Sequence, residues 1–365
     1  MRRRSLLLVV SLVCGLVVAG LAFGAKPPPK KPKKPGGPGS PHAFSWHDTP
    51  TGSTASLRGI SAVSANVVWA SGSVPGTVLR TTDRGATWQS VAPPETSTLE
   101  FRDIEAFGPN RAVIMAAGMG TRSRIYRTTD AGQTWTLVFQ NTDANAFYDC
   151  MTFFNKKVGL ALSDPPDGVK FRILKTTDGG RTWSVVDPAG MPPALPDEFA
   201  FAASGQCITS NHGRSAWFGT GGSTQARVFT TRNRGRTWRV SATPLNSGPT
   251  TGINALAFRS QQHGIVVGGD FAMPANSPNN FAATRNGGRT WALLSGAPPE
   301  YRSGATWVNG NTALAVGPTG SDFSRNKGRT WTRFENDSLL HTVDCANPNA
   351  CWASGASGRV AFLVR

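Results

Sequence analysis

Six polar residues recur at one position of an internal repeat in this 365-residue chain: Arg58, Arg102, Tyr148, Asn254, Arg302 and His341. Planar guanidinium groups bind carboxylates and phosphates through paired hydrogen bonds. In a ring of repeats this position lies where the innermost strands begin, at the mouth of the central channel. We therefore expect the arginines to bind a carboxylate, a phosphate or the acidic end of a polypeptide. In the alternative interpretation they pair with Asp103, Asp149 and loop acids, and only join neighbouring repeats.

Motifs for common catalytic chemistries are absent from the sequence. It contains no G-x-S-x-G nucleophile elbow, no H-E-x-x-H zinc motif and no phosphate-binding G-x-x-x-x-G-K-[ST]. The histidines are scattered, and isolated histidines are more often ordinary surface or core residues than ligands. We predict no metal ion and no cofactor.

The architecture follows from a short block that occurs six times. Three copies, at residues 81–88, 128–135 and 176–183, begin with Thr-Thr-Asp and end with Thr-Trp. Three variants, at 233–238, 286–291 and 326–331, have Asn in place of Asp. Successive block tryptophans are 47, 48, 55, 53 and 40 residues apart, the period of a four-stranded propeller blade.

Each block predicts a turn between two antiparallel strands. The Asp or Asn side chain accepts backbone N–H groups, and Gly supplies the left-handed residue that closes the hairpin. The turn-building residues are Asp83, Asp130, Asp178, Asn233, Asn286 and Asn326. We expect the block Trp to fill the space between neighbouring sheets, burying on the order of 200 Å².

A second repeated element predicts how the ring closes. Residues 66–72 (NVVWASG) are echoed by 349–355 (NACWASG), which begin a seventh repeat without an outer strand. Phe44-Ser45-Trp46 can supply that strand. The predicted fold is all-β: a seven-bladed β-propeller of four-stranded antiparallel blades, with its last blade closed by the N-terminal strand.

The turn blocks resemble the Asp-box, or bacterial neuraminidase repeat, of a large group of β-propellers. Within that group, residues 42–365 are most similar to bacterial relatives of the photosystem II stability and assembly factors, through the blocks, the Trp-Ala-Ser-Gly strands and phrases such as Gly317-Pro318-Thr319-Gly320. The resemblance implies a non-catalytic scaffold that docks a protein or peptide of an envelope or membrane complex at the channel mouth. The same turn occurs in sialidases, xyloglucan hydrolases and sorting receptors, so it indicates fold more strictly than function.

The alternative function is a glycan-binding or glycan-cleaving propeller. A sialidase-like glycosidase needs an arginine triad, a Tyr nucleophile with a Glu beside it, and an acid/base Asp. Glu300, Tyr301 and Arg302 are the only suggestive trio. The sialidase Arg-Ile-Pro signature is missing, because residues 172–174 read Arg-Ile-Leu. We therefore favour a binding protein over an enzyme; if the chain is an enzyme, it is a glycoside hydrolase.

Two Pro-rich insertions stand apart from the repeat, at residues 164–168 and 189–201. Long loops on a rigid scaffold are where recognition tends to reside. The alternative is a stiff linker between blades.

Four cysteines remain beyond the N-terminal segment. Cys345 and Cys351 flank a turn-rich loop, so we predict a disulfide across that hairpin. Cys150 and Cys207 fall in the inner strands of adjacent blades, where either a bridge or two buried thiols is compatible with the sequence.

The N-terminal residues predict export. Residues 1–24 combine three arginines with a long apolar run, which indicates a signal peptide or an uncleaved membrane anchor. Residues 25–41 form a Lys/Pro-rich linker. We expect a periplasmic or extracellular monomer with possible membrane contact through this segment.

The charge of residues 42–365 favours an acidic partner. They hold 30 basic and 21 acidic residues, and 25 of the basic residues are Arg. We expect no nucleic-acid partner, because the basic residues are spread through the repeats and an exported chain seldom meets nucleic acids.

Overall fold

The computed structural model describes residues 44–73, 75–211 and 213–365. The predicted signal or anchor segment, the linker and His212 lie outside these ranges. The described residues form 28 strands and three 3₁₀ helices, η1 (Gly120–Arg122), η2 (Pro188–Gly190) and η3 (Ala356–Gly358). Within these ranges no helix has the length and apolar character needed to cross a membrane. The fold is all-β, as predicted.

The strands form antiparallel sheets, five with four strands and one with eight. The eight-stranded sheet contains β2 (Ser56–Ala62), β3 (Val68–Ser73), β4 (Thr77–Thr81), β5 (Gln89–Ser90), β6 (Glu100–Ala106), β7 (Ala112–Ala117), β8 (Arg124–Thr128) and β9 (Thr136–Gln140). Its two halves, β2–β5 and β6–β9, are joined through one residue pair, Ser73 with Glu100.

The remaining sheets follow the order of the chain. They are β10 (Tyr148–Phe153), β11 (Gly159–Ser163), β12 (Arg172–Thr176) and β13 (Ser184–Val185); β14 (Ile208–Ser210), β15 (Ala216–Gly219), β16 (Arg227–Thr231) and β17 (Trp238–Ala242); β18 (Thr251–Phe258), β19 (Gly264–Asp270), β20 (Phe281–Thr284) and β21 (Ala292–Leu293); and β22 (Gly304–Trp307), β23 (Ala313–Gly317), β24 (Gly320–Ser324) and β25 (Thr332–Asn336). The final sheet contains β26 (Leu340–Asn347), β27 (Ala350–Gly355), β28 (Val360–Val364) and β1 (Ser45–Thr49).

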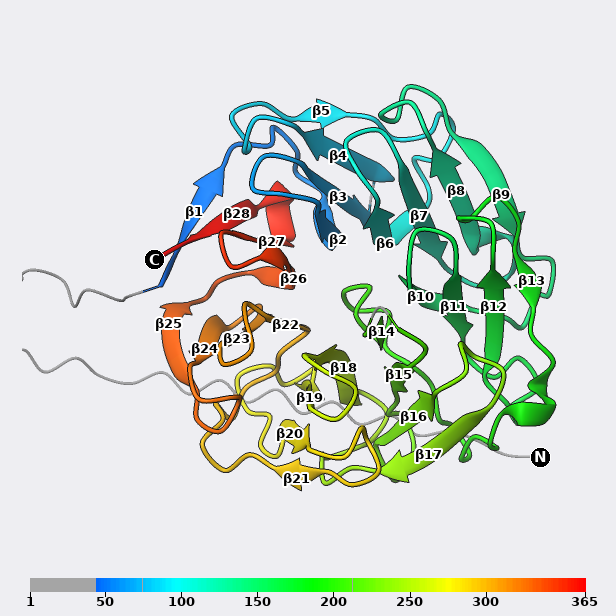
Figure 1. The fold of residues 1–365 in the computed structure, drawn as a ribbon, viewed down its shortest axis with the longest axis vertical. Helices are drawn as coiled ribbons and strands as arrows, with labels where there is room; N and C mark the ends of the chain where they lie inside the picture. The colour runs from blue at the N-terminus through cyan, green and yellow to red at the C-terminus, as the bar shows by residue number, and fades with distance from the viewer. Residues whose placement is uncertain (1–43, 74, 212) are drawn as a thin grey trace, which may run out of the picture. The chain divides into compact units, whose positions relative to one another are not determined.

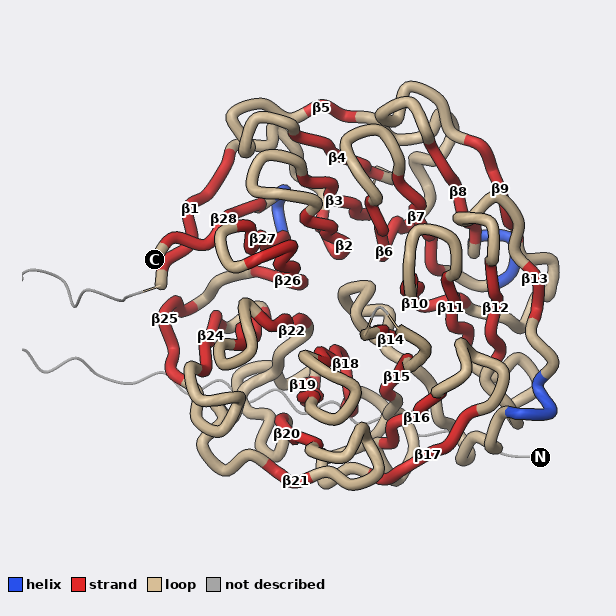
Figure 2. The backbone as a smooth tube through the Cα atoms, in the orientation of Figure 1, coloured by secondary structure: helices blue, strands red, loops and turns tan. Residues whose placement is uncertain are grey.

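The sheets of residues 44–365 are arranged around a common centre, with loops at their edges (Figures 1 and 2). Each innermost strand contacts the innermost strand of the next sheet, from β2 and β6 through β22 and β26, and β26 contacts β2. This closed ring of radially arranged sheets is the architecture of a β-propeller.

The N-terminal strand belongs to the last sheet. β1 pairs antiparallel with β28, with Ser45 opposite Val364 and Thr49 opposite Val360. The indole Nε1 of Trp46 donates to Ser321 Oγ of the preceding sheet at 2.9 Å. Segments from the two ends of the described chain therefore form one sheet, and this pairing closes the ring.

The turn blocks have a shared hydrogen-bond pattern. Asp83 Oδ1 accepts the backbone N–H of Thr87 at 2.9 Å, and Asp83 Oδ2 accepts the Thr87 hydroxyl at 2.5 Å. Thr81 Oγ1 accepts the N–H of Gly85, whose φ of 78° favours glycine. In the variant turns an Asn side chain makes the equivalent bonds, with Asn233 Oδ1 accepting from Thr237 N and Asn233 Nδ2 donating to Thr237 Oγ1.

These hydrogen bonds favour the ionised form of the turn aspartates. Bonds from Thr87 lower the pKa of Asp83 to about 2, and bonds from Thr134 lower the pKa of Asp130 to about 2. In Asp178, burial acts to raise the pKa, but bonds from Thr182 and its neighbours outweigh it and lower the pKa to about 2.

Changing all three turn aspartates to Asn is expected to flatten the acid limb of the stability profile. The folded pKa values lie below the unfolded value of about 4, so the stability these groups contribute is present above that value and is lost as pH falls toward 2. Urea unfolding at neutral pH and near pH 2.5 measures the difference. The protein's own Asn turns show that Asn fits the same geometry. An equal loss of stability in both proteins on acidification would contradict the prediction.

The burial of the tryptophans between the sheets differs from the prediction. Trp69, Trp217 and Trp352, which lie on second strands, are the largest fully buried side chains. Most block tryptophans are half-buried. Three of the six, Trp88, Trp135 and Trp291, bond to the preceding sheet; Trp135 Nε1 donates to the Val91 carbonyl at 2.7 Å. Trp135 also packs edge-to-face on Trp69, with ring centroids 6.4 Å apart. The block Trp therefore covers the outer part of the sheet interface, because its neighbour on the second strand already fills the interior.

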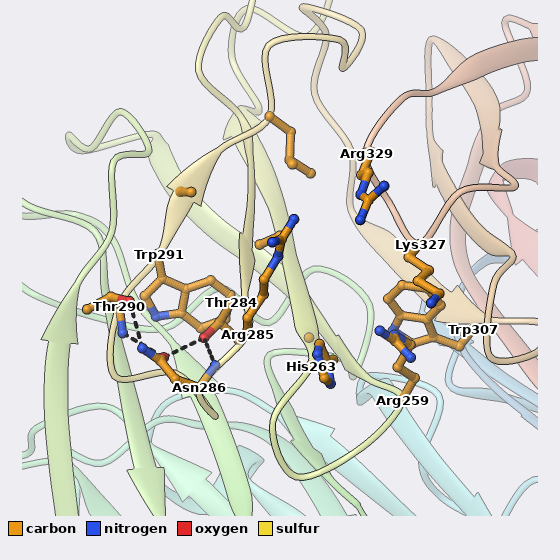
Figure 3. A pocket seen from close by; sticks show the side chains of 14 residues that line it. Arg259, His263, Thr284, Arg285, Asn286, Thr290, Trp291, Trp307, Lys327 and Arg329 are labelled. Atoms are coloured by element: carbon orange, nitrogen blue, oxygen red, sulfur yellow. Dashed lines mark hydrogen bonds between the residues drawn. The ribbon is translucent and has the colours of Figure 1, made fainter.

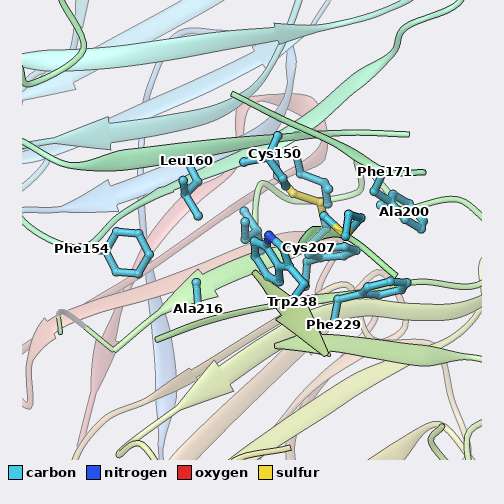
Figure 4. Packing of buried hydrophobic residues seen from close by; sticks show 14 residues of the cluster. Cys150, Phe154, Leu160, Phe171, Ala200, Cys207, Ala216, Phe229 and Trp238 are labelled. Carbon is cyan, nitrogen blue, oxygen red and sulfur yellow. A yellow bond between two sulfur atoms is a disulfide. The ribbon is translucent and has the colours of Figure 1, made fainter. Parts of the chain in front are cut away.

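Two disulfides join the described cysteines, Cys345 with Cys351 and Cys150 with Cys207. Cys345 and Cys351 face each other across the β26–β27 hairpin. Cys150 and Cys207 lie in a core cluster with Phe171, Phe229 and Trp238 (Figure 4). The second bridge settles the choice that the sequence left open.

Candidate functional site

A pocket of about 340 Å³ lies at the start of several innermost strands. We call it the mouth pocket; its lining residues are Arg58, Arg102, Phe201, Ala202, Ala203, Asn254, Phe271, Tyr301, Pro318 and His341. Four of the six polar residues singled out in the sequence, Arg58, Arg102, Asn254 and His341, therefore share one site.

A β-bulge places each of these four side chains. The pairing register of β2 skips Arg58, that of β6 skips Arg102, and that of β18 skips Asn254; His341 is skipped in the same way in β26. A bulged residue is left out of the ladder, and the bulge turns its side chain away from the regular alternation. The bulges explain why residues from separate sheets converge on one pocket.

The two arginines carry more positive charge than their surroundings neutralise. Arg58 Nη1 donates to the carbonyl of Ala203 at 3.1 Å, and Arg102 Nη1 donates to the carbonyl of Ala202 at 2.9 Å. Arg102 also forms an ion pair with Glu100. Burial, and then the positive charge of Arg102, lower the pKa of Arg58. An acidic group entering the pocket would relieve this repulsion.

The remaining polar wall of the mouth pocket is uncharged. His341 Nε2 lies 3.1 Å from Ser56 Oγ, and burial together with Arg58 lowers the pKa of His341 to about 4. The hydroxyl of Tyr301 donates to Asn254 Oδ1 at 3.1 Å, and burial raises the pKa of Tyr301. Positive charge at this site therefore comes from the two arginines.

Tyr148 and Arg302 lie outside the mouth pocket. In β10 the skipped residue is Asp149, so Tyr148 points into the core, where its ring lies 5.3 Å from that of Phe139 and burial raises its pKa to about 12. β22 begins only at Gly304 and has no bulge, and Arg302 is fully buried. Its Nε donates to Asp322 Oδ2 at 2.7 Å. The Arg302 side chain therefore pairs with an acid of its own sheet, so it neither lines the mouth pocket nor joins neighbouring repeats as the alternative interpretation had it.

A segment of the chain crosses the channel beneath the mouth pocket. Residues 202–206, the crossing segment, precede β14, which lies near the centre of the ring (Figure 1). Gln206 Nε2 donates to the carbonyls of Ala305 at 3.1 Å and Val343 at 3.0 Å, and Ser204 Oγ donates to the carbonyl of Ser303. Gly205 has a φ of 71°, and a Cβ there would lie 2.7 Å from Asp103 Oδ1. The segment is thus fixed to strands of several other sheets.

The crossing segment separates a basic end of the channel from an acidic one. A second pocket, of about 390 Å³, is lined by residues 204–206 and by Asp103, Glu105 and Asp344. Burial raises the pKa of Asp103 well above its usual value. Burial, Asp103 and Asp344 do the same for Glu105. Asp103 therefore belongs to the acidic pocket and does not pair with the mouth arginines; its Oδ2 accepts the N–H of Met151 at 2.6 Å.

The trio suggestive of a sialidase does not assemble. The Glu300 carboxylate lies 2.9 Å from Arg333 Nη2 and also pairs with Arg302, while the Tyr301 hydroxyl donates to Asn254. A nucleophilic Tyr needs a lowered pKa or an adjacent base, and burial raises the pKa of Tyr301 instead. In the part of the chain that the structure describes, no group of three His, Cys, Asp or Glu side chains is placed to hold a metal ion.

Sequence reasoning missed the apolar half of the mouth pocket. Phe201, at the end of the predicted 189–201 insertion, packs against Phe271 with ring centroids 6.0 Å apart, and Phe271 is 49% exposed. The long Pro-rich insertion was the available signal, but nothing in its sequence indicated that the chain after it enters the channel.

No protein-family model and no curated protein matches the sequence. Solved structures do match it. YCF48 bound to D1 peptide has a TM-score of 0.62 at 15% identity over 89% of this chain and 96% of that chain, and YCF48 from Cyanidioschyzon merolae has a TM-score of 0.61 at 14% identity over 88% and 98%. The GH74 enzyme of Niastella koreensis has a TM-score of 0.58 at 16% identity, over 87% of this chain and 53% of that chain.

A WD40 β-propeller domain of Doa1 is similar at the same level, with a TM-score of 0.58 and 11% identity over 88% of this chain and 97% of that domain. These neighbours have different functions, and at such identities the likeness establishes the β-propeller fold alone.

Proposed function

We propose that this chain is an exported, non-catalytic binding scaffold that docks a protein or peptide partner at the mouth pocket. The observation that carries the proposal is the pair Arg58 and Arg102 beside the apolar surface of Phe201 and Phe271. Of these two arginines, only Arg102 has a carboxylate partner, Glu100, among the described ion pairs. Surplus guanidinium charge next to exposed aromatic surface suits a peptide with an apolar residue and an acidic group, such as a free C-terminus.

The proposal includes a seven-bladed Asp-box propeller. In support, the halves β2–β5 and β6–β9 count as separate blades if the single Ser73–Glu100 pair is disregarded, and the turn bonds of Asp83 recur in the other blocks. YCF48 is a propeller of similar fold that has been observed with a bound peptide. By extension of the sequence resemblance to the photosystem II assembly factors, the partner here would be part of an envelope or membrane complex.

Export, an N-terminal signal or anchor and a monomeric state remain part of the proposal. Two disulfides among the described cysteines favour an oxidising compartment. Glycan binding or cleavage is the competing function, and the GH74 fold neighbour gives it a precedent in this architecture. The bonded Tyr301 hydroxyl argues against a sialidase-like mechanism.

Replacing Arg58 or Arg102 with Ala is expected to weaken peptide binding by about 10- to 100-fold, since a hydrogen bond to a charged group is worth roughly 1.5–3 kcal/mol. Fluorescence anisotropy with labelled peptides that end in an apolar residue and a free carboxylate measures the loss. The same peptides with an amidated C-terminus should bind the unchanged protein comparably weakly.

Arg239→Ala is the matched control, because Arg239 is an exposed arginine on β17 away from the mouth pocket. Binding that survives the Arg58→Ala/Arg102→Ala double change would contradict the proposal. Hydrolysis of fluorogenic glycosides that is lost in Tyr301→Phe would overturn it in favour of the glycosidase.

A further inference from the structure

A third pocket, which is strongly basic, lies at the opposite edge of the sheets from the mouth pocket. Strands alternate in direction, so the hairpins that join first to second and third to fourth strands gather at one edge, away from the start of the innermost strands. Between the sheet of β18–β21 and the sheet of β22–β25, this edge holds a cavity of about 600 Å³. Its basic lining residues are Arg259, His263, Arg285, Lys327 and Arg329.

The positive charge in this pocket is not neutralised. No Asp or Glu lines the cavity, and the described ion pairs do not involve Arg259, Arg285, Lys327 or Arg329. Arg259 instead stacks on Trp307, with its Cζ 5.4 Å from the ring centre. Burial, Arg259, Arg285 and Lys327 lower the pKa of His263, which is the effect expected of crowded cations.

The cations come from both neighbouring sheets and face a shared space. Figure 3 shows Arg285 and Trp291 on one side, and Lys327, Arg329 and Trp307 on the other, with His263 between them. Lys327 and Arg329 belong to the turn block between β24 and β25, and the hydrogen bonds of Asn326 and Gly328 hold this turn in place. The site is therefore carried by rigid turns.

A similar arrangement recurs two interfaces earlier along the ring, between the sheet of β10–β13 and the sheet of β14–β17. Lys175 of β12 faces Arg234 and Arg236, the turn-block residues equivalent to Lys327 and Arg329, across a hollow of about 440 Å³ that Arg214 also lines. Burial, and then Arg236 and Arg234, lower the pKa of Lys175. Repetition of uncompensated cations along one edge suits a ligand that carries repeated negative charges.

We infer that this edge binds an anionic polysaccharide, whose carboxylate, sulfate or phosphate groups enter the pocket between β18–β21 and β22–β25. A chain-like ligand fits because the cations line hollows between sheets, which a flat membrane surface cannot enter. Sugar rings fit because the tryptophans Trp291 and Trp307 form the walls between which the cations lie. The site is distinct from the mouth pocket and independent of the proposed peptide docking.

Binding of labelled polygalacturonate and of heparin to the full chain at low ionic strength tests the inference. Lys327→Gln/Arg329→Gln is expected to weaken binding by about tenfold or more, since two charge-assisted contacts are lost. Both residues are exposed, so the variant should keep the wild-type unfolding temperature. Arg122→Gln/Arg124→Gln, at the other edge between β7 and β8, removes the same charge and should bind as wild type.

Neutral dextran, oligothymidylate and phosphatidylglycerol vesicles complete the test. The inference would be overturned if the unchanged protein bound neither polygalacturonate nor heparin. It would also be overturned if the two double variants lost the same amount of polysaccharide binding. Tighter binding of oligothymidylate or of vesicles would reject the ligand class. Arg58→Ala should leave polysaccharide binding intact, so this experiment can fail or succeed separately from the peptide experiment.

Discussion

Replacing Asp322 with Ala is expected to lower the free energy of unfolding by about 3–5 kcal/mol, the usual cost of removing one partner from a buried ion pair. Asp322 is 1% exposed in its side chain, and its Oδ2 accepts from Arg302 Nε at 2.7 Å. Arg302 has no exposed side-chain surface, so the change would leave a guanidinium in the interior with Glu300 as a distant partner at 3.4 Å. Urea unfolding followed by tryptophan fluorescence measures the loss.

Two further variants separate charge from packing and burial from exposure. Asp322→Asn keeps the side-chain volume and should remain destabilising, because the charge of Arg302 stays uncompensated. Asp48→Ala breaks the 2.8 Å contact with Arg359 at the surface, where Asp48 is 63% exposed, and should cost less than about 1 kcal/mol. Similar losses at Asp322 and Asp48 would show that Arg302 is not held as the structure places it.

The repeated corners of the fold were predictable because they are local. Each turn block contains its acceptor, its left-handed Gly and its return Thr within eight residues, so the sequence alone gives both partners of every bond. The outer position of β1 was predictable for a related reason: the last repeat lacked a strand and Trp46 supplied the missing aromatic. The sequence did not predict that the second-strand tryptophans would be more buried than the block tryptophans, because this difference depends on how far apart the sheets lie.

The mouth pocket was only partly predictable: the error at Tyr148 is one residue along β10, whereas Arg302 precedes a strand that has no bulge. Side chains alternate along a strand, so a bulge decides which of two neighbours faces the channel. The aligned position coincides with the bulge at Arg58 and Arg102, but in β10 the bulge lies at Asp149 and β22 has none. A repeat alignment carries no information about such a shift, because the position of a bulge depends on how the backbone pairs with the neighbouring strand.

The crossing segment depends on contacts that no local pattern encodes. Ala203 and Gln206 bond to Arg58 and Val343, which are more than a hundred residues away in the chain. The short β14 is the structural sign of this detour, as its sheet lacks the first half of an innermost strand. The segment sets both the floor of the mouth pocket and the separation of its arginines from the acidic pocket.

Removing the Cys150–Cys207 disulfide is expected to cost about 4 kcal/mol, and removing Cys345–Cys351 about 2 kcal/mol, in the loop-closure model of disulfide stabilisation. The first bridge closes a loop with a sequence separation of 57 and the second one of 6, so the first restricts the unfolded chain more. Paired Cys→Ala variants, compared by urea unfolding under identical conditions, measure the two costs.

The comparison is matched because each pair of substitutions deletes two sulfur atoms from buried or half-buried sites, so the loss of packing is similar and the difference reports the loop. Cys207 directly follows the crossing segment, and its disulfide with Cys150 anchors that segment to β10. Its loss should therefore weaken peptide binding at the mouth pocket as well, whereas loss of the hairpin bridge should not. A larger cost for Cys345–Cys351 would contradict the loop-closure argument. Unchanged peptide binding without Cys150–Cys207 would mean that the hydrogen bonds of Ser204 and Gln206 hold the crossing segment without help from the bridge.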